Sequence, residues 1–170
     1  SGGMRQRVMI AIALACEPDM LLADEPTTAL DATIQAQIIE LMVSLTARTK
    51  TALILISHDL AVVSQACSRI ITMYGGALVE DGPAREVLRR PLHPYTSGLL
   101  GAMLGNAPPK SRLLSIPGRL ASKASGNGCA FKERCTHSQP RCAEPQSKSG
   151  GVHTALCCRA EELELLGATS

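Results

Sequence analysis

Two adjacent carboxylates, Asp24 and Glu25, directly follow a short apolar run and are the first candidates for chemistry in this chain. The run, residues 20–23, has the pattern of a strand covered on both faces, and in α/β sheets ligands bind outside the carboxyl ends of the strands. Adjacent side chains point to opposite sides, so one carboxylate can hold a hydrated Mg²⁺ while the other polarises a water molecule. A solvated turn is the alternative interpretation of an Asp-Glu pair taken alone.

A histidine and a pair of glycines can complete a phosphate site. His58 follows a second apolar strand, residues 51–57, and at the end of a neighbouring parallel strand it is a candidate to contact a phosphate group. A structural histidine is the alternative. Gly2 and Gly3 stand at the start of a helix expected over residues 3–16, whose N-terminus attracts anions through its free backbone N–H groups. Ser1 can add a hydroxyl donor, although Ser-Gly-Gly also occurs in flexible linkers.

The elements that position these residues alternate between strand and helix patterns. Asp31 stands where a helix N-cap belongs, and an apolar stripe at helical spacing follows it. A further helix is expected near residues 59–67, and Gly75-Gly76 indicates a hairpin between two strands. This order predicts an α/β fold with a mainly parallel sheet.

The composition excludes several classes of protein. Only 2% of the 170 residues are aromatic, which speaks against modules that stack nucleic-acid bases on aromatic rings. The net charge of +2 is too small to hold a polyanion by charge alone, so no nucleic acid is expected as a partner. The longest apolar run, residues 8–16, is about half the ~20 residues that a membrane-spanning helix needs.

Charge and composition divide the chain near Arg90 and Pro91. Residues 1–90 are slightly acidic and carry the strand and helix patterns. Residues 91–170 are basic, rich in proline, glycine and serine, and hold five of the seven cysteines. We therefore expect an α/β domain over residues 1–90 and a small, loop-rich, cysteine-containing extension over residues 91–170.

The segments SGGMRQR, MLLADEPTTALD and LISHD, in this order, strongly resemble the ATP-binding subunits of ABC transporters. The resemblance implies that residues 1–90 are the C-terminal part of a P-loop-type ABC ATPase domain, with ATP and Mg²⁺ as cofactors. It implies that Asp24 acts on Mg²⁺, that Glu25 is the general base for the attacking water, and that His58 contacts the γ-phosphate. The residues that it assigns to nucleotide binding, in the signature loop, the Walker B strand and the D-loop, are Ser1, Gly2, Gly3, Gln6, Asp24 and Asp31.

The same resemblance implies partners. In that family the signature loop touches nucleotide bound to the opposite subunit, so hydrolysis requires a second ABC ATPase subunit, identical or not. Two membrane permease subunits and, indirectly, an extracytoplasmic solute-binding protein complete the importer, and the ATPase lies peripherally at the cytoplasmic face of the plasma membrane. The 170 residues contain no G-x-x-x-x-G-K-[ST] loop, which supplies the phosphate cradle and its lysine. We therefore expect the C-terminal part of a subunit, inactive alone.

The second region carries a further resemblance. The stretches LHPYTSGLL, GCAFKERC and HTALC resemble the C-terminal extension of oligopeptide and dipeptide importer ATPases, a group that includes nickel and glutathione importers. The resemblance implies that four cysteines can bind a [4Fe-4S] cluster, namely Cys129, Cys135, Cys142 and Cys157. They lack the close spacing typical of zinc sites, although zinc and reduced thiols remain alternatives. Cys158 is expected to be a spare thiol.

Taken together, these resemblances imply an ATPase subunit that energises the uptake of dipeptides or oligopeptides. Two other classes of protein share some of the features. A soluble ABC-type ATPase acting on DNA would be expected to carry coiled-coil heptads or zinc modules, and neither pattern occurs here. In a non-catalytic metal-cluster module, the carboxylates and the histidine of the first region would have no chemical task.

Overall fold

The computed structural model describes residues 2–102, 115–118 and 128–168. The chain forms two compact units, unit 1 over residues 1–67 and unit 2 over residues 68–170. This division falls earlier in the chain than the change in composition near Arg90, and the reason lies in the strand pairing of unit 2. The two units are described separately.

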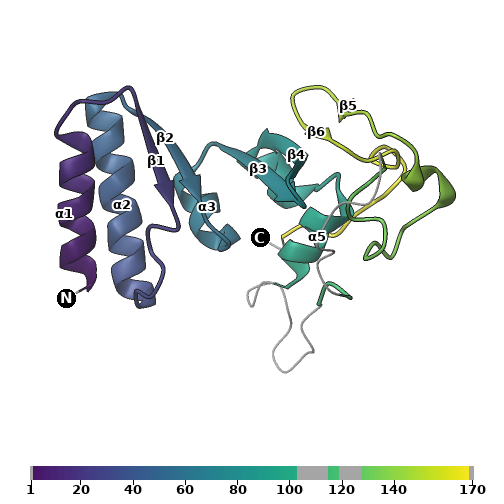
Figure 1. Ribbon diagram of the computed structural model, residues 1–170, viewed down its shortest axis with the longest axis horizontal. Helices are drawn as coiled ribbons and strands as arrows, with labels where there is room; N and C mark the ends of the chain where they lie inside the picture. Colours follow the sequence, from purple (N-terminus) through teal and green to yellow (C-terminus); the bar gives the residue numbers. More distant parts are fainter. Residues whose placement is uncertain (1, 103–114, 119–127, 169–170) are drawn as a thin grey trace. The chain divides into compact units, whose positions relative to one another are not determined.

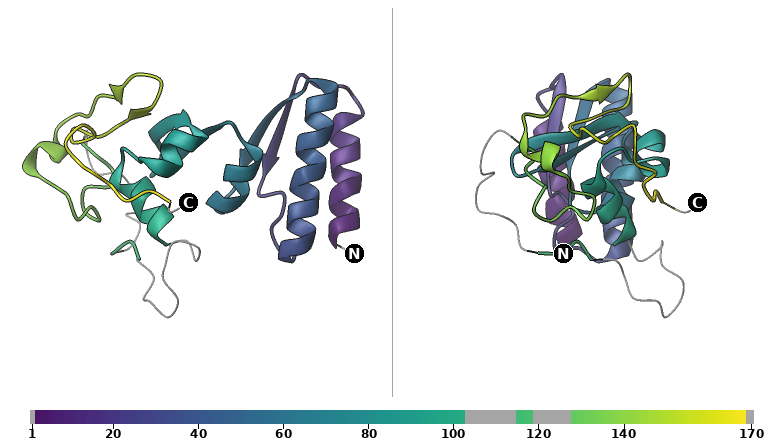
Figure 2. Two further views of the ribbon diagram at one scale, coloured as in Figure 1. Left: turned by 180° about the vertical axis from the view of Figure 1, so that it is seen from behind. Right: turned by 90° about the vertical axis from the view of Figure 1, so that its right-hand side faces the viewer.

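Unit 1 consists of a two-stranded parallel sheet and three helices. The elements, in chain order, are α1 (Gly2–Leu14), β1 (Met20–Asp24), α2 (Ala32–Thr49), β2 (Ala52–Ile56) and α3 (Leu60–Ala66). Strands β1 and β2 pair with Met20 opposite Ala52 and Asp24 opposite Ile56. Helices α1 and α2 lie side by side next to this sheet in Figures 1 and 2.

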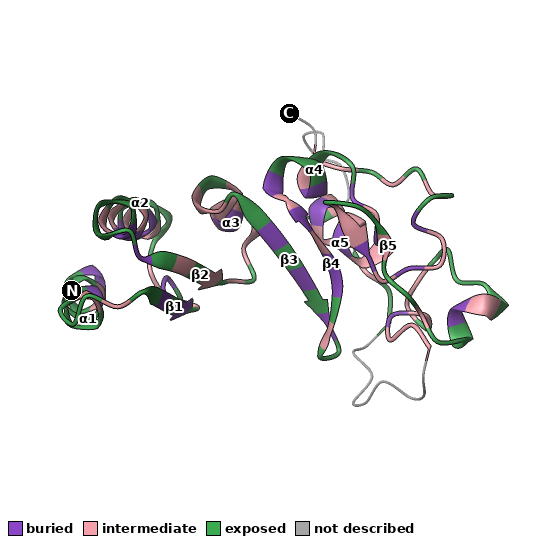
Figure 3. Ribbon diagram, turned by 90° about the horizontal axis from the view of Figure 1, so that it is seen from above, coloured by how far each residue is buried: buried purple, intermediate pink, exposed green. Residues whose placement is uncertain are grey.

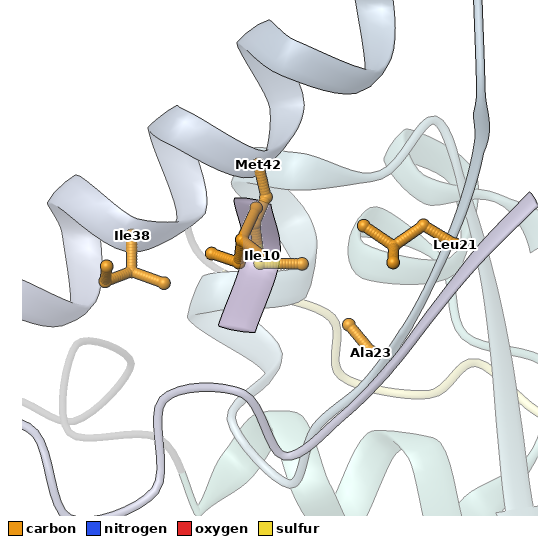
Figure 4. Close-up of a cluster of buried hydrophobic side chains, with 5 residues drawn as sticks. All are labelled: Ile10, Leu21, Ala23, Ile38 and Met42. Carbon is orange, nitrogen blue, oxygen red and sulfur yellow. The ribbon is translucent and has the colours of Figure 1, made fainter. Parts of the chain in front are cut away.

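The core of unit 1 lies between the two helices and one face of the sheet. Its buried side chains, drawn in Figure 4, are Ile10, Leu21, Ala23, Ile38 and Met42. Along β1 these residues alternate with Met20 and Leu22, which are 55% and 58% exposed. The expectation that this strand is covered on both faces is therefore wrong for the described residues, because the two helices pack on one side only.

Unit 2 is built on a hairpin. Strands β3 (Arg69–Tyr74) and β4 (Ala77–Pro83) pair in antiparallel fashion around Gly75 and Gly76, whose φ angles of 57° and 82° suit glycine. Strand β3 alternates between exposed and buried residues, as Figure 3 shows. The expected hairpin is confirmed.

Two short strands of the extension join this hairpin. Strand β4 pairs with β6 (Thr154–Ala155), which pairs with β5 (Ser149–Gly150), so the sheet order is β3-β4-β6-β5. This pairing groups the hairpin with the C-terminal part of the chain and explains why unit 2 begins at residue 68. The remaining elements of unit 2 are α4 (Ala84–Arg89), α5 (Pro94–Gly101) and the 3₁₀ helix η2 (Pro140–Ala143).

Loops connect these elements, and a small aromatic core holds them together. Tyr74 and Val79 from the hairpin pack with Phe131, and the rings of Tyr74 and Phe131 meet edge to face with centroids 5.0 Å apart. The α/β class is confirmed, with parallel pairing confined to β1 and β2 among the described strands. None of the described helices is both long and apolar enough to cross a membrane.

Candidate functional site

The parallel pairing of β1 and β2 brings Glu25 and His58 into contact where the two strands end. The Glu25 backbone N–H donates to the Ile56 carbonyl at 2.9 Å, so the two segments stay hydrogen-bonded one residue beyond the end of β1. His58 Nδ1 then lies 2.8 Å and 2.9 Å from the two carboxylate oxygens of Glu25. The His58 backbone N–H also donates to Glu25 Oε1, at 3.1 Å. Two residues separated by 32 others thus form one carboxylate–imidazole pair.

This contact changes the pKa of both side chains. The hydrogen bond from His58 lowers the pKa of Glu25, and the carboxylate raises the pKa of His58. The Glu25 side chain is 36% exposed and that of His58 is 81% exposed, so water screens the pair. We therefore infer that the pair orients the carboxylate and contributes little to the stability of the fold.

The turn after β1 aims the carboxylate. Glu25 has a φ of 46°, in the left-handed region that non-glycine residues seldom occupy, and Ala29 follows with a φ of 65°. Such backbone conformations persist where surrounding contacts hold them, and they cluster at functional sites. Here one of the contacts is the Thr28 hydroxyl, which donates to Glu25 Oε2 at 3.2 Å.

The loop that carries His58 is held by Asp59. The Asp59 carboxylate caps α3 by accepting the Ala61 backbone N–H at 2.9 Å, and it also accepts the Gln35 side-chain amide of α2 at 3.3 Å. Sequence reasoning missed the positioning contacts of Thr28 and Gln35. The Asp59 cap could have been found, because an aspartate directly before a helical run is a common N-cap.

Asp24 and Asp31 occupy different settings. Asp24 ends β1 and is exposed, so its oxygens can reach a cation from solvent. Asp31 is the N-cap of α2, as the sequence predicts, and its Oδ1 accepts the Ile34 backbone N–H at 2.9 Å. Their assignments to Mg²⁺ and nucleotide stay predictions.

The glycines at the start of α1 have a packing role. A Cβ on Gly3 would lie 2.8 Å from Ile34 Cγ2, and one on Gly2 would lie 3.0 Å from Leu30 Cδ2. These glycines let the N-terminus of α1 approach the start of α2 closely. Gln6 is half-buried on α1, and Ser1 lies outside the described residues. The expected anion-binding end of this helix therefore stands beside the segment that leads into α2.

A second cluster lies in unit 2, where four cysteines line one small cavity. They are the four that the sequence singles out, Cys129, Cys135, Cys142 and Cys157. The Cys129 backbone N–H donates to the Cys142 carbonyl at 2.9 Å, which ties the two segments together. Cys158 lies outside the described lining, and its sulfur is 3.8 Å from that of Cys142.

Burial controls the chemistry of these thiols. Loss of hydration raises the pKa of Cys129, Cys135 and Cys157, and the neighbouring thiols raise it further. Burial and the contact with Cys142 raise the pKa of Cys158 to about 11. These four thiols, Cys129, Cys135, Cys157 and Cys158, are therefore protonated at neutral pH unless a cation compensates their charge.

Other polar groups also line this cavity: His93, Lys132, His137, Gln146 and Arg159. Arg159 opposes the rise in the pKa of Cys135 and Cys157. Burial lowers the pKa of His93 to about 4, so its ring is neutral at physiological pH. Within residues 2–102, 115–118 and 128–168, no group of three or more His, Cys, Asp or Glu side chains is arranged to hold a metal ion.

Two family models match the chain. The model for the C-terminal region of oligopeptide/dipeptide transporters matches residues 79–142. The ABC transporter model matches residues 1–28, which include α1, β1 and Glu25.

Named relatives match nearly the whole chain. The dipeptide transport ATP-binding protein DppD of Escherichia coli is 53% identical over 143 residues, which are 84% of this chain and 44% of that protein. DppD of Haemophilus influenzae is 48% identical over 176 aligned positions, with 99% of this chain and 53% of the relative covered. A probable peptide ABC transporter ATP-binding protein of Sinorhizobium fredii, y4tR, is 46% identical over 96% of this chain and 50% of its own length.

The family models and the relatives agree on one class of protein, the ABC-type ATP-binding proteins. Within that class, the chain belongs to the oligopeptide/dipeptide transporter family. The chain spans about half the length of the curated relatives it matches. Neither the DNA-acting ATPase nor the non-catalytic metal module finds support among these relatives.

The Glu25–His58 ion pair should depend on pH. A raised pKa means that His58 keeps its proton to a higher pH than an isolated histidine, and the lowered pKa of Glu25 means that the carboxylate stays charged to a lower pH. The ion pair should therefore persist from below pH 4.5 to above pH 6.5 and break outside that window. NMR titration of the His58 ring should give a pKa above 6.5, and Glu25→Gln should move it back toward that value.

Thr28→Val is the matched control for this titration. It removes the hydroxyl donor to Glu25 and leaves the carboxylate in place, so it should shift the His58 titration far less than Glu25→Gln. An unshifted His58 in the parent chain, or equal effects of the two variants, would contradict the pairing.

Proposed function

We propose that this chain is part of the ATP-binding and ATP-hydrolysing subunit of an ABC importer that energises the uptake of dipeptides or oligopeptides across the plasma membrane. The contact between Glu25 and His58 at the ends of β1 and β2 is the observation that carries the proposal. It joins a carboxylate suited to activating water with an imidazole suited to a phosphate. The names of the relatives, dipeptide and peptide transport ATP-binding proteins, support the substrate class.

In this proposal Glu25 is the general base. Its carboxylate is held between the His58 ring and the Thr28 hydroxyl, and its low pKa keeps it ionised at neutral pH. A carboxylate held in one orientation can accept the proton of a water molecule that attacks a terminal phosphate. His58, with its high exposure and raised pKa, is available to donate to that phosphate.

Asp24 is the proposed Mg²⁺ ligand. Magnesium prefers oxygen ligands and keeps several water molecules, and the exposed carboxylate of Asp24 fits that preference. When bound, the ion would neutralise phosphate charge. Gly2, Gly3, Gln6 and Asp31 are proposed to contact nucleotide from the α1 end of unit 1, next to the packing contacts described above.

The proposal includes partners. Phosphoryl transfer depends on positioning and on charge stabilisation, and the resemblance to ABC ATPases implies that the signature loop contacts nucleotide bound to the opposite subunit. We propose that it acts with a second ABC ATPase subunit and two membrane permeases, peripherally at the cytoplasmic face of the membrane. An extracytoplasmic solute-binding protein would deliver the solute.

We further propose that the cysteine cavity holds a [4Fe-4S] cluster. Four thiols, the usual ligand set of such a cluster, line one cavity with Lys132 and Arg159. Zinc needs its four ligands around one point, whereas in a cluster each thiolate binds a different iron atom.

The role of Glu25 is tested in a full-length subunit that contains this chain. Glu25→Gln removes the base and keeps the shape of the side chain, so ATP turnover should fall by roughly 10²–10⁴ while ATP binding is retained. Thr28→Val, which loses one positioning hydrogen bond, should cost much less. Unchanged turnover in the Glu25→Gln variant would remove Glu25 from this role.

The 170-residue polypeptide by itself should be inactive. Without the amide cradle and lysine of a P-loop it should neither hold ATP tightly nor hydrolyse it. A phosphate-release assay with Mg-ATP should give the rate of a buffer blank. Reproducible Mg-dependent turnover that copurifies with the chain would refute this prediction.

The cluster is tested by anaerobic purification with iron and sulfide analysis. The chain should be coloured and contain about four iron atoms. Cys157→Ser should lose most of that iron, whereas Cys158→Ser, outside the described lining of the cavity, should keep it. A folded parent chain that is colourless and free of iron after anaerobic reconstitution would contradict the proposed cluster. Bound zinc in place of iron would show that the four cysteines form a zinc site.

A further inference from the structure

His93 is a buried residue whose chemistry the ATPase proposal does not use. It is 1% exposed and forms the N-cap of α5, where its Nδ1 accepts the Tyr95 backbone N–H at 3.1 Å. A ring nitrogen that accepts a hydrogen bond carries no proton, so the proton of the neutral ring is on Nε2. The cap therefore determines which nitrogen of His93 is the donor.

The Nε2 of His93 has no hydrogen-bond partner among the described residues. A buried donor without an acceptor is unfavourable and calls for a ligand or another explanation. His93 is also part of the lining of the cavity formed by the four cysteines. An unsatisfied buried donor and a set of four thiols thus share one cavity.

The position of His93 is strongly held. The side chain of Glu80, on β4, is completely buried and accepts the backbone N–H groups of Leu92 at 2.7 Å and of His93 at 3.0 Å. On its other side the ring of His93 lies 5.9 Å, centroid to centroid, from that of Phe131. Contacts to both the backbone and the ring therefore hold His93 in the wall of the cavity.

We propose that His93 is a positioning residue that donates an N–H···S hydrogen bond from Nε2 to a sulfur atom of the group held by the four cysteines, and so raises its reduction potential. The inference rests on the proposed [4Fe-4S] cluster. Hydrogen bonds to the sulfurs are among the factors that set the potential of such clusters. A donor favours the reduced state because that state carries one more negative charge.

Two substitutions separate this role from the cap. His93→Asn keeps an acceptor that can cap α5 but does not extend to the position of Nε2, because Asn is a favoured N-cap and a shorter side chain. His93→Gln places an amide donor near the position of Nε2 and gives up the cap. His137→Asn is the matched control, because His137 lines the same cavity but is exposed.

The measurement is a redox titration, with dithionite as reductant, of the full chain after anaerobic reconstitution. His93→Asn should lower the ratio of reduced to oxidised cluster about tenfold at a given applied potential, a shift of about 59 mV for one electron. His93→Gln and His137→Asn should stay near the parent value, and all variants should bind the same amount of iron. Equal reduction potentials in the parent and in His93→Asn would contradict the role of His93 without contradicting the proposed cluster.

A measurement on the parent chain covers the case in which a variant does not fold. Pulsed EPR of the reduced cluster, in protein labelled with ¹⁵N-histidine, should detect a coupled histidine nitrogen and its exchangeable proton, and their absence would overturn the hydrogen bond. If the parent chain binds no iron, the cluster fails, and the inference built on it fails with it.

Discussion

The geometry of the candidate site depends on the parallel register of β1 and β2. Asp24 stands opposite Ile56, and Glu25 continues the pairing through its bond to the Ile56 carbonyl. A slip of one residue would move the strand ends by about 3.3 Å, more than the Glu25–His58 hydrogen bonds tolerate. It would also exchange the buried and exposed faces of β1. The alternation that places Leu21 and Ala23 in the core therefore also sets the distance between the carboxylate and the imidazole.

Several residues of the candidate site serve packing and chemistry together. Gly3 admits Ile34 at a distance that leaves no room for a Cβ, and Asp31 caps the helix that carries Ile34. A substitution at either position would disturb the packing of α1 on α2 as well as any nucleotide contact. For that reason Glu25 and His58, which are not part of the core of unit 1, report on chemistry more directly than the glycines do.

Local patterns predict much of this fold. The Asp31 cap and the hairpin at Gly75 depend on neighbouring residues, and both are confirmed. The pairing of β4 with β6, between residues 80 and 155, is not encoded in any local pattern, so the division of the chain after residue 67 could not be predicted. The resemblance of their segments to ABC ATPases named Glu25 and His58 as candidates, but the contacts of Thr28 and Gln35 depend on tertiary packing.

The buried side chain of Glu80 joins several segments of unit 2 into one packed structure. Its buried carboxylate accepts hydrogen bonds from the backbone of Leu92 and His93 and lies 2.7 Å from His153 Nε2. A buried carboxylate is costly unless it is fully satisfied, so β4, the start of α5 and the segment before β6 must assemble together. The same assembly holds His93 in the wall of the cysteine cavity.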